Sequence, residues 1–98
     1  MALPLTGTTD VPTAGTRVQV DNTTRRVLSI TFKGRVGNTG NVYVGGSTVS
    51  STAGFELQVN QSITFDFASG LVSGVMSDFY VDAATDGNDV DFAAILWP

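Results

Sequence analysis

The sequence predicts an all-β protein, and three features of its composition support this prediction. Val, Ile and Thr make up 29 of the 98 residues, whereas Lys and Glu occur once each and Leu only six times. β-Branched residues favour strands, and the residues that favour exposed helix faces are almost absent. Ser and Thr number 21 and Gly 11, which suits short strands joined by many turns. We therefore expect an antiparallel β-sandwich, jelly-roll-like or Ig-like, of seven to eight short strands with an extended N-terminal arm.

The first 15 residues show no hydrophobic period and contain two of the three prolines. We interpret residues 1–15 as an extended N-terminal arm and residues 16–98 as the sandwich domain. The arm lacks the basic start and the long apolar core of a secretion signal, so we expect none. It does carry apolar side chains that could be buried on its own domain or on a partner, namely Leu3, Leu5 and Val11.

Apolar side chains alternate with polar ones along three segments of the first half, residues 16–20, 27–34 and 41–45. Such alternation is typical of strands that bury one face. It places Tyr43 on the outer face. It predicts the following inward-facing set: Val18, Val20, Leu28, Ile30, Phe32, Val42 and Val44.

The second half repeats the pattern over residues 55–59, 62–67, 78–83 and 90–96. The inward-facing set is Phe55, Leu57, Val59, Ile63, Phe65, Phe67, Phe79, Val81, Val90, Phe92, Ala94 and Leu96. The outward-facing set includes Asp78, Tyr80, Asp82, Asp89 and Asp91. Each sheet is therefore expected to have one solvated face.

Three connecting segments complete the pattern. Residues 45–54 are predicted to form a flexible polar loop, and Asp86-Gly87 has the composition favoured in a hairpin turn. Residues 68–77 combine helix-like apolar spacing with two glycines and three serines, so a helix and a loop both remain open there.

The absence of Cys and His excludes several kinds of chemistry. Disulfides, structural zinc sites and Ser-His-Asp or Cys-His nucleophiles are all ruled out. Asp78 and Asp82 would lie about 13 Å apart on one strand, too far for a pair of glycosidase carboxylates. We therefore expect no enzymatic activity, no metal and no cofactor. Residues 86–91 lack the ligand register of an EF-hand, and a surface cation contact there stays open.

The charge is divided unevenly along the chain. Residues 1–49 carry a net charge of +3 and residues 50–98 a net charge of −7, which gives −4 in total. One interpretation is that basic and acidic strands face each other within the fold. The other is a bipolar surface that orients the domain against a charged partner. With five basic residues and a pI of about 4.2, we expect no binding to nucleic acid. No apolar run approaches 18 residues, so we expect no membrane-spanning helix.

The chain ends on the apolar sequence Ile95-Leu96-Trp97-Pro98. If Leu96 points inward, Ile95 and Trp97 point outward, and exposed aromatic residues are frequent anchors of protein interfaces. Together with the arm and the basic residues, they form our candidate interface set: Leu3, Leu5, Val11, Arg17, Arg25, Arg26, Tyr80, Ile95 and Trp97.

Residues 26–67 also resemble a known class of protein. The segments GNVYVGG, GFEL and SITFDF, followed by a strand at residues 78–83, are similar to runs in small β-sandwich virion proteins of tailed bacteriophages. The resemblance is to head decoration or cement proteins in particular. It implies a trimer that binds the major capsid protein on the outside of the phage head and ties neighbouring capsid subunits together. It also implies a location on the virion capsid surface after synthesis in the host cytoplasm, and it assigns no role to individual residues.

A second hypothesis is a receptor- or carbohydrate-binding module of a phage tail or fibre. It requires Tyr43, Tyr80 or Trp97 to form a stacking platform beside the acidic face. The sequence does not distinguish a head location from a tail location.

Overall fold

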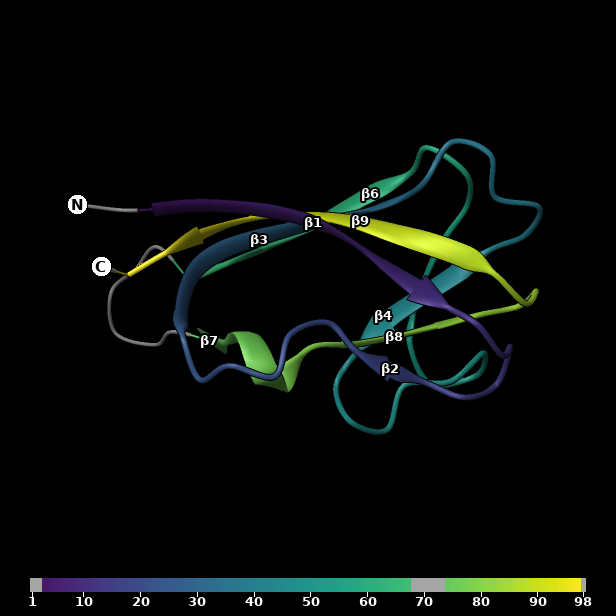
Figure 1. Cartoon of the computed structure of the whole chain (residues 1–98), viewed down its shortest axis with the longest axis horizontal. Helices are drawn as coiled ribbons and strands as arrows, with labels where there is room; N and C mark the ends of the chain where they lie inside the picture. Colours follow the sequence, from purple (N-terminus) through teal and green to yellow (C-terminus); the bar gives the residue numbers. More distant parts are fainter. Residues whose placement is uncertain (1–2, 68–73, 98) are drawn as a thin grey trace.

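The computed structural model describes residues 3–67 and 74–97, which form two sheets packed face to face (Figure 1). The composition-based prediction of an all-β sandwich is therefore confirmed. The regular elements are β1 (Leu3–Val11), β2 (Val18–Gln19), β3 (Arg26–Gly34), β4 (Val42–Gly45), β5 (Phe55–Leu57), β6 (Ser62–Asp66), β7 (Gly74–Val75), the 3-10 turn η1 (Met76–Asp78), β8 (Tyr80–Ala83) and β9 (Asn88–Leu96). The two strands that the alternation did not mark are β1 and β7.

The order of the strands identifies a jelly roll. One sheet has the order β1-β9-β3-β6, with β7 also pairing with β3, and the other has the order β2-β8-β4-β5. Early strands thus pair with late strands in a nested series, β1 with β9, β2 with β8, β3 with β6 and β4 with β5. A long antiparallel hairpin folded over on itself gives this nesting, which is the jelly-roll alternative of the two that the sequence left open.

The N-terminal segment is extended, and residues 3–11 are part of the sandwich itself. β1 pairs with β9 along all nine of its residues and forms an edge of the larger sheet. Its inner face contributes Val11 to the core and packs Leu5 against it. Gly7 is needed on this face, because a Cβ there would lie 2.8 Å from the ring of Phe92.

A β-bulge in β3 changes which residues face the core. Val27 pairs with Leu96 whereas Ser29 pairs with Ile95, so Leu28 is an extra residue on β3. Val27 consequently takes the buried position and Leu28 is only half-buried. The prediction that Leu28 belongs to the inward-facing set was wrong, because strict alternation does not continue through a bulge.

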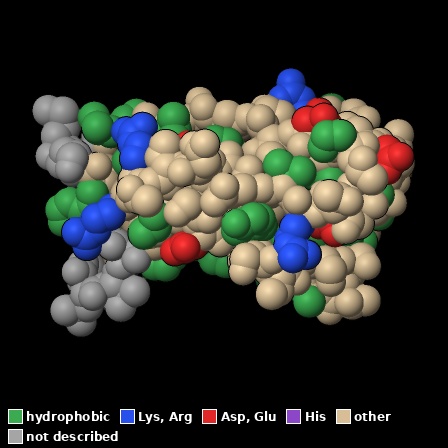
Figure 2. Space-filling model, turned by 60° about the horizontal axis from the view of Figure 1, so that its bottom comes forward, with side chains coloured by type: hydrophobic (Ala, Val, Ile, Leu, Met, Phe, Trp, Pro, Cys, Tyr) green, Lys and Arg blue, Asp and Glu red, His purple; other side chains and the backbone are tan. Residues whose placement is uncertain are grey.

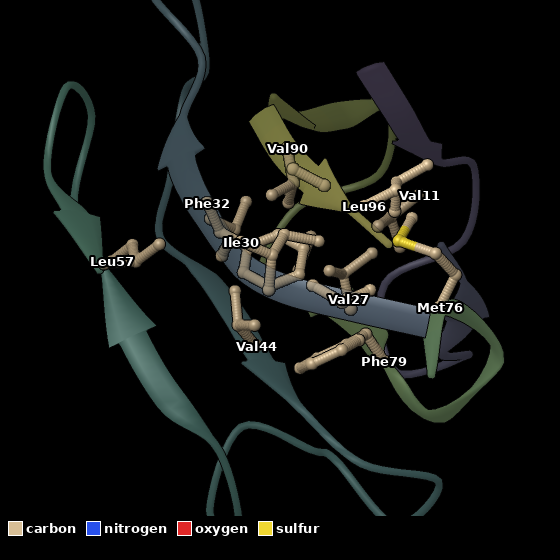
Figure 3. Packing of buried hydrophobic residues seen from close by; sticks show 14 residues of the cluster. Val11, Val27, Ile30, Phe32, Val44, Leu57, Met76, Phe79, Val90 and Leu96 are labelled. Atoms are coloured by element: carbon tan, nitrogen blue, oxygen red, sulfur yellow. The ribbon is translucent and has the colours of Figure 1, made fainter. Parts of the chain in front are cut away.

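The core lies between the two sheets and is drawn from almost every strand (Figure 3). Phe32 lies near its centre, with ring centroids 6.0 Å from Phe65 and 5.6 Å from Phe79. Phe55 and Val59 were predicted to be buried, but they are 54% and 39% exposed. Phe55 begins the edge strand β5, and Val59 follows that strand in the segment that leads to β6.

The outer face of the smaller sheet is covered rather than solvated. The 46–54 loop folds back over it and buries Val49 beside Tyr43, which is only 6% exposed. Asp82, on the neighbouring strand β8 and opposite Tyr43, is 1% exposed. The predicted outward exposure of Tyr43 and Asp82 was therefore wrong, because segments distant in sequence pack on this face.

The segment between β5 and β6 crosses from one sheet to the other. Asn60 adopts a left-handed conformation there, with φ of 68°. The crossing passes so close to β3 that a Cβ on Gly34 would lie 2.5 Å from the carbonyl oxygen of Gln58. Glycine is thus required at the end of β3 by close backbone approach.

Residues 68–77, for which the sequence allowed either a helix or a loop, are described only from residue 74 onward. Residues 74–75 form β7 and residues 76–78 form η1, and the remainder lies outside the described residues. Asp86-Gly87 does form a turn, with Gly87 at φ of 80°. The predicted hairpin was wrong, because this turn joins β8 of one sheet to β9 of the other. Among the described residues, no helix is long and apolar enough to cross a membrane.

Candidate functional site

Both chain ends lie at the same end of the sandwich, because β1 starts where β9 finishes (Figure 1). Leu3, Ile95 and Trp97 are 39%, 38% and 42% exposed there, and Pro4 and Arg26 are exposed with them. We call these five residues the terminal surface. Pro4 is the cross-strand partner of Ile95 on the outer face of the sheet, whereas Leu3 is the partner of the inward-facing Leu96 and is exposed at the start of β1. Figure 2 shows basic and hydrophobic side chains together at this end of the molecule. An exposed apolar patch with a polar rim is typical of a protein interaction site.

The position of Trp97 is fixed by β3. Its backbone N–H donates a hydrogen bond to the carbonyl of Arg26 at 3.0 Å. The guanidinium of Arg26 lies over the indole, 5.7 Å from the ring centroid, which is within range of a cation–π interaction. Leu96 is fully buried between the exposed Ile95 and Trp97, so the predicted alternation at this end is confirmed.

The other candidate interface residues do not all join this surface. Arg25 is exposed and precedes Arg26, so it adjoins the terminal surface. Leu5 is half-buried against the core, and Val11 is fully buried, which removes Val11 from any interface. Arg17 is exposed beside β2, and Tyr80 is half-buried on β8, both in the smaller sheet or next to it.

Basic and acidic residues meet across β3 and β9, as the first interpretation of the charge pattern expects. Arg35 forms a salt bridge of 2.9 Å with Asp91, and Lys33 is the direct cross-strand partner of the same residue. Thr8 donates a hydrogen bond to Asp91 and accepts one from Arg35. The side chains of this network are exposed or half-buried, so their interactions contribute little to stability.

Two carboxyl groups face each other where β1 meets β9. Asp10 and Asp89 are direct cross-strand partners. Partial burial raises the pKa of Asp89, and a hydrogen bond with Asp10 and repulsion from its charge raise it further. The positive charge of Arg35 lowers the pKa of Asp89. Among the described residues, no group of three or more acidic side chains is arranged to hold a metal ion.

The residues expected for carbohydrate stacking are dispersed. Tyr43 is buried under the 46–54 loop, Tyr80 is half-buried on β8, and Trp97 belongs to the other sheet. Asp78 lies in η1 and Asp82 is buried in β8, so they do not share the exposed strand face that the alternation predicted.

Two pockets were missed by sequence reasoning, because each joins segments far apart in the chain. One, of about 390 Å³, is lined by Phe65, Phe67 and Phe79 on one side and by the end of β4 on the other. The second, of about 370 Å³, has Asp82 in its wall and lies between the turn at residues 12–16 and the 46–54 loop. No local sequence pattern marks either one.

The chain matches no protein-family profile and shows no significant sequence similarity to a curated protein. The resemblance to phage head proteins therefore stays a prediction at the level of sequence.

Solved structures share its fold. The Pseudomonas aeruginosa metallopeptidase IMPa, in complex with an O-glycopeptide, matches with a TM-score of 0.57 and 15% identity over 96% of this chain. This chain spans only 12% of the length of that enzyme. A protein of the Bacillus endospore appendages, which form disulfide-linked pili, matches with a TM-score of 0.55 and 14% identity over 97% of this chain and 85% of that one. The SPBc2 prophage-derived protein YomS gives a TM-score of 0.40 at 17% identity, covering 96% of this chain and 94% of that one.

Proposed function

We propose that this chain is a non-enzymatic structural protein of a virion, a decoration or cement subunit that binds the outside of a phage head. The observation that carries the proposal is the terminal surface, where Leu3, Ile95 and Trp97 remain exposed and the guanidinium of Arg26 lies over the indole of Trp97. A tryptophan held in place by a backbone hydrogen bond and a guanidinium loses little freedom on binding. Such preorganised aromatic anchors dominate the energy of many interfaces.

The edge strand β1 extends this surface along the molecule. The outer edge of β1 is not paired with any described strand, and it runs for nine residues from the terminal surface. An open edge can add a strand from a neighbouring protein through backbone hydrogen bonds. In the proposed assembly, the anchors bind the capsid subunit and the edge of β1 contacts the next molecule of a trimer.

The fold is compatible with a role in assembly. Jelly rolls occur in viral capsid proteins and in lectins, so the fold alone does not separate the proposed role from carbohydrate binding. The appendage protein with the same fold belongs to pili that are linked by disulfides. This chain has no cysteine, so the residues given cannot form disulfides with a neighbour. A stable obligate non-covalent interface would need to bury about 2,000 Å² or more.

The proposal is tested with phage heads prepared without this protein. Purified wild-type protein should sediment with the heads, and the Ile95→Ser, Trp97→Ala double variant should lose most of that binding. Phe55→Ala is the matched control, because Phe55 is an equally exposed aromatic residue on the other sheet. If the folded double variant binds heads as strongly as wild type does, the assignment of the terminal surface as the head-binding site is overturned. Wild-type protein that ignores heads and sediments with cell-surface glycan would favour the tail or fibre module instead.

A further inference from the structure

A buried carboxylate forms part of a pocket between the turn at residues 12–16 and the 46–54 loop. The turn between β1 and β2 lies at the end of the sandwich opposite the termini (Figure 1). Asp82 is 1% exposed, and it lines the 370 Å³ pocket together with small residues from three segments. The turn at residues 12–16 forms one wall, the 46–54 loop another, and the end of β8 the floor. Only the folded jelly roll brings these segments together.

The hydrogen bonds of Asp82 engage one of its two oxygens. Oδ1 accepts hydrogen bonds from the backbone N–H groups of Gly15, at 3.0 Å, and Ala83, at 2.8 Å. In the described part of the chain, no donor reaches Oδ2 and no Lys or Arg forms a salt bridge with Asp82. Arg17, which follows the turn, is exposed and does not pair with it.

Oδ1 is stabilised by its two N–H donors, and Oδ2 keeps contact with the opening of the pocket. A positive charge placed in that opening would be the strongest partner for Oδ2. Asp86 holds the same turn by accepting a hydrogen bond from the N–H of Ala14 at 2.7 Å, and it adds a second negative charge. Because Asp86 is exposed, it performs this structural task without the cost of burial. An exposed carboxylate can therefore anchor this turn, so anchoring the turn does not explain why Asp82 is buried beside a pocket.

The lining of the pocket suits a cationic group. Ser51 supplies a hydroxyl oxygen that can accept a hydrogen bond, whereas the hydroxyl of Ser50 already accepts one from the N–H of Thr52 at 3.3 Å. The remaining residues are Ala14, Gly15, Ala83 and Ala84, which leave room without adding a charge. A guanidinium or ammonium group would pair with Oδ2 of Asp82 and donate to the Ser51 hydroxyl.

We propose that this pocket binds the cationic end of an arginine or lysine side chain from a partner protein. The inference goes beyond the proposed function, because the pocket shares no residue with the terminal surface. Binding here would fix the orientation of the domain on its partner, which is the usual contribution of a specific charge pair. The inference about the pocket does not depend on the partner being a phage head.

The test is an NMR titration of the full chain with N-acetyl-arginine amide and N-acetyl-lysine amide. Saturable shifts are expected at the backbone amides of Gly15, Ser51 and Ala83. N-acetyl-citrulline amide has nearly the shape of the arginine probe without its charge, and it should bind at least about tenfold more weakly. Equal binding of the citrulline and arginine probes, or shifts that do not saturate, would overturn the proposal.

Asp82→Asn tests the residue itself. The amide keeps an oxygen for the Gly15 and Ala83 N–H groups, so the variant should fold while losing at least about nine-tenths of its affinity for the arginine probe. Asp86→Asn, which removes a charge from the same turn outside the pocket, should retain most of the affinity. A folded Asp82→Asn variant with wild-type affinity contradicts the proposal.

Sedimentation then identifies the source of the side chain. Weaker self-association of Asp82→Asn than of wild type would identify a second copy of this chain as the partner. Unchanged self-association, together with lost binding of the arginine probe, would identify a different protein.

Discussion

The two ends of the sandwich use their side chains in opposite ways. At the end that carries the termini, Leu3, Ile95 and Trp97 remain exposed. At the other end, Asp82 and Asp86 accept hydrogen bonds from the backbone of the 12–16 turn, so their polar atoms serve the fold itself. The difference teaches that the terminal end gathers exposed apolar side chains from the paired strands β1 and β9, whereas the other end uses carboxylates to fix a turn. Substitutions of exposed residues at the terminal end should alter association, whereas substitutions that remove these backbone hydrogen bonds at the other end should alter stability.

The largest effect is expected where the terminal end meets the core. Leu96 is fully buried, whereas its neighbour Ile95 is 38% exposed. Leu96→Ala should lower the free energy of unfolding by about 3 kcal/mol, because it removes buried methyl groups and leaves a cavity. Ile95→Ala should lower it by less than about 1 kcal/mol.

Urea unfolding of the two variants measures this difference directly. Equal destabilisation by the two substitutions would mean that β9 does not alternate between core and surface at its end, and the terminal surface would then lose its structural basis.

A smaller effect is expected at the opposite end, from close packing of backbone. Gly34→Ala places a Cβ 2.5 Å from the carbonyl oxygen of Gln58, and neither backbone can move without disturbing a strand. We expect a loss of about 2 kcal/mol in the free energy of unfolding. Gly46→Ala is the control, because its Cβ would meet nothing closer than 3.9 Å. Thermal unfolding should rank the two variants in this order, and a wild-type melting temperature for Gly34→Ala would refute the close approach.

Sequence patterns predicted the C-terminal strand of the terminal surface well and the N-terminal strand poorly. The alternation at Ile95, Leu96 and Trp97 was sufficient, because a strand with one buried face has a period of two. Strand β1 was missed as a strand, because its Pro and Gly residues interrupt that period and its partners in β9 lie 77 to 93 residues further along the chain. The cation–π contact between Arg26 and Trp97 depends on the same long-range pairing, in this case of β3 with β9.

The covered face of the smaller sheet shows a different kind of failure. Tyr43 and Asp82 were assigned to solvent because their neighbours along each strand face the core. Their burial is caused by the 46–54 loop and the 12–16 turn, whose paths are not encoded in the period of the strands. The pocket with its buried carboxylate could be found only after the fold was known.

The smallest effect is expected from the carboxyl pair where β1 meets β9. The pKa of Asp89 is raised by burial and by Asp10, so the folded protein binds a proton more readily than the unfolded chain does. The stability that this residue contributes is therefore fully present at low pH and is lost as the pH rises through the pKa of the folded state. The charged form of Asp89 is disfavoured by its burial and by repulsion from Asp10 across the strands.

Asp89→Asn should consequently raise the free energy of unfolding by about 0.5 kcal/mol at neutral pH, because the amide removes the repulsion and can donate a hydrogen bond to Asp10. The gain should shrink as the pH falls from neutral into the acidic range, because the raised pKa of Asp89 lets the wild-type carboxyl group take up a proton there, with the same effect. The hydrogen bonds between Asn38 and the backbone of residue 89 remain in the variant, so the change isolates the carboxyl group. Urea unfolding of both proteins across this pH range measures the effect. A variant less stable than wild type at neutral pH would show that the Arg35 guanidinium, rather than Asp10, dominates the field at this position.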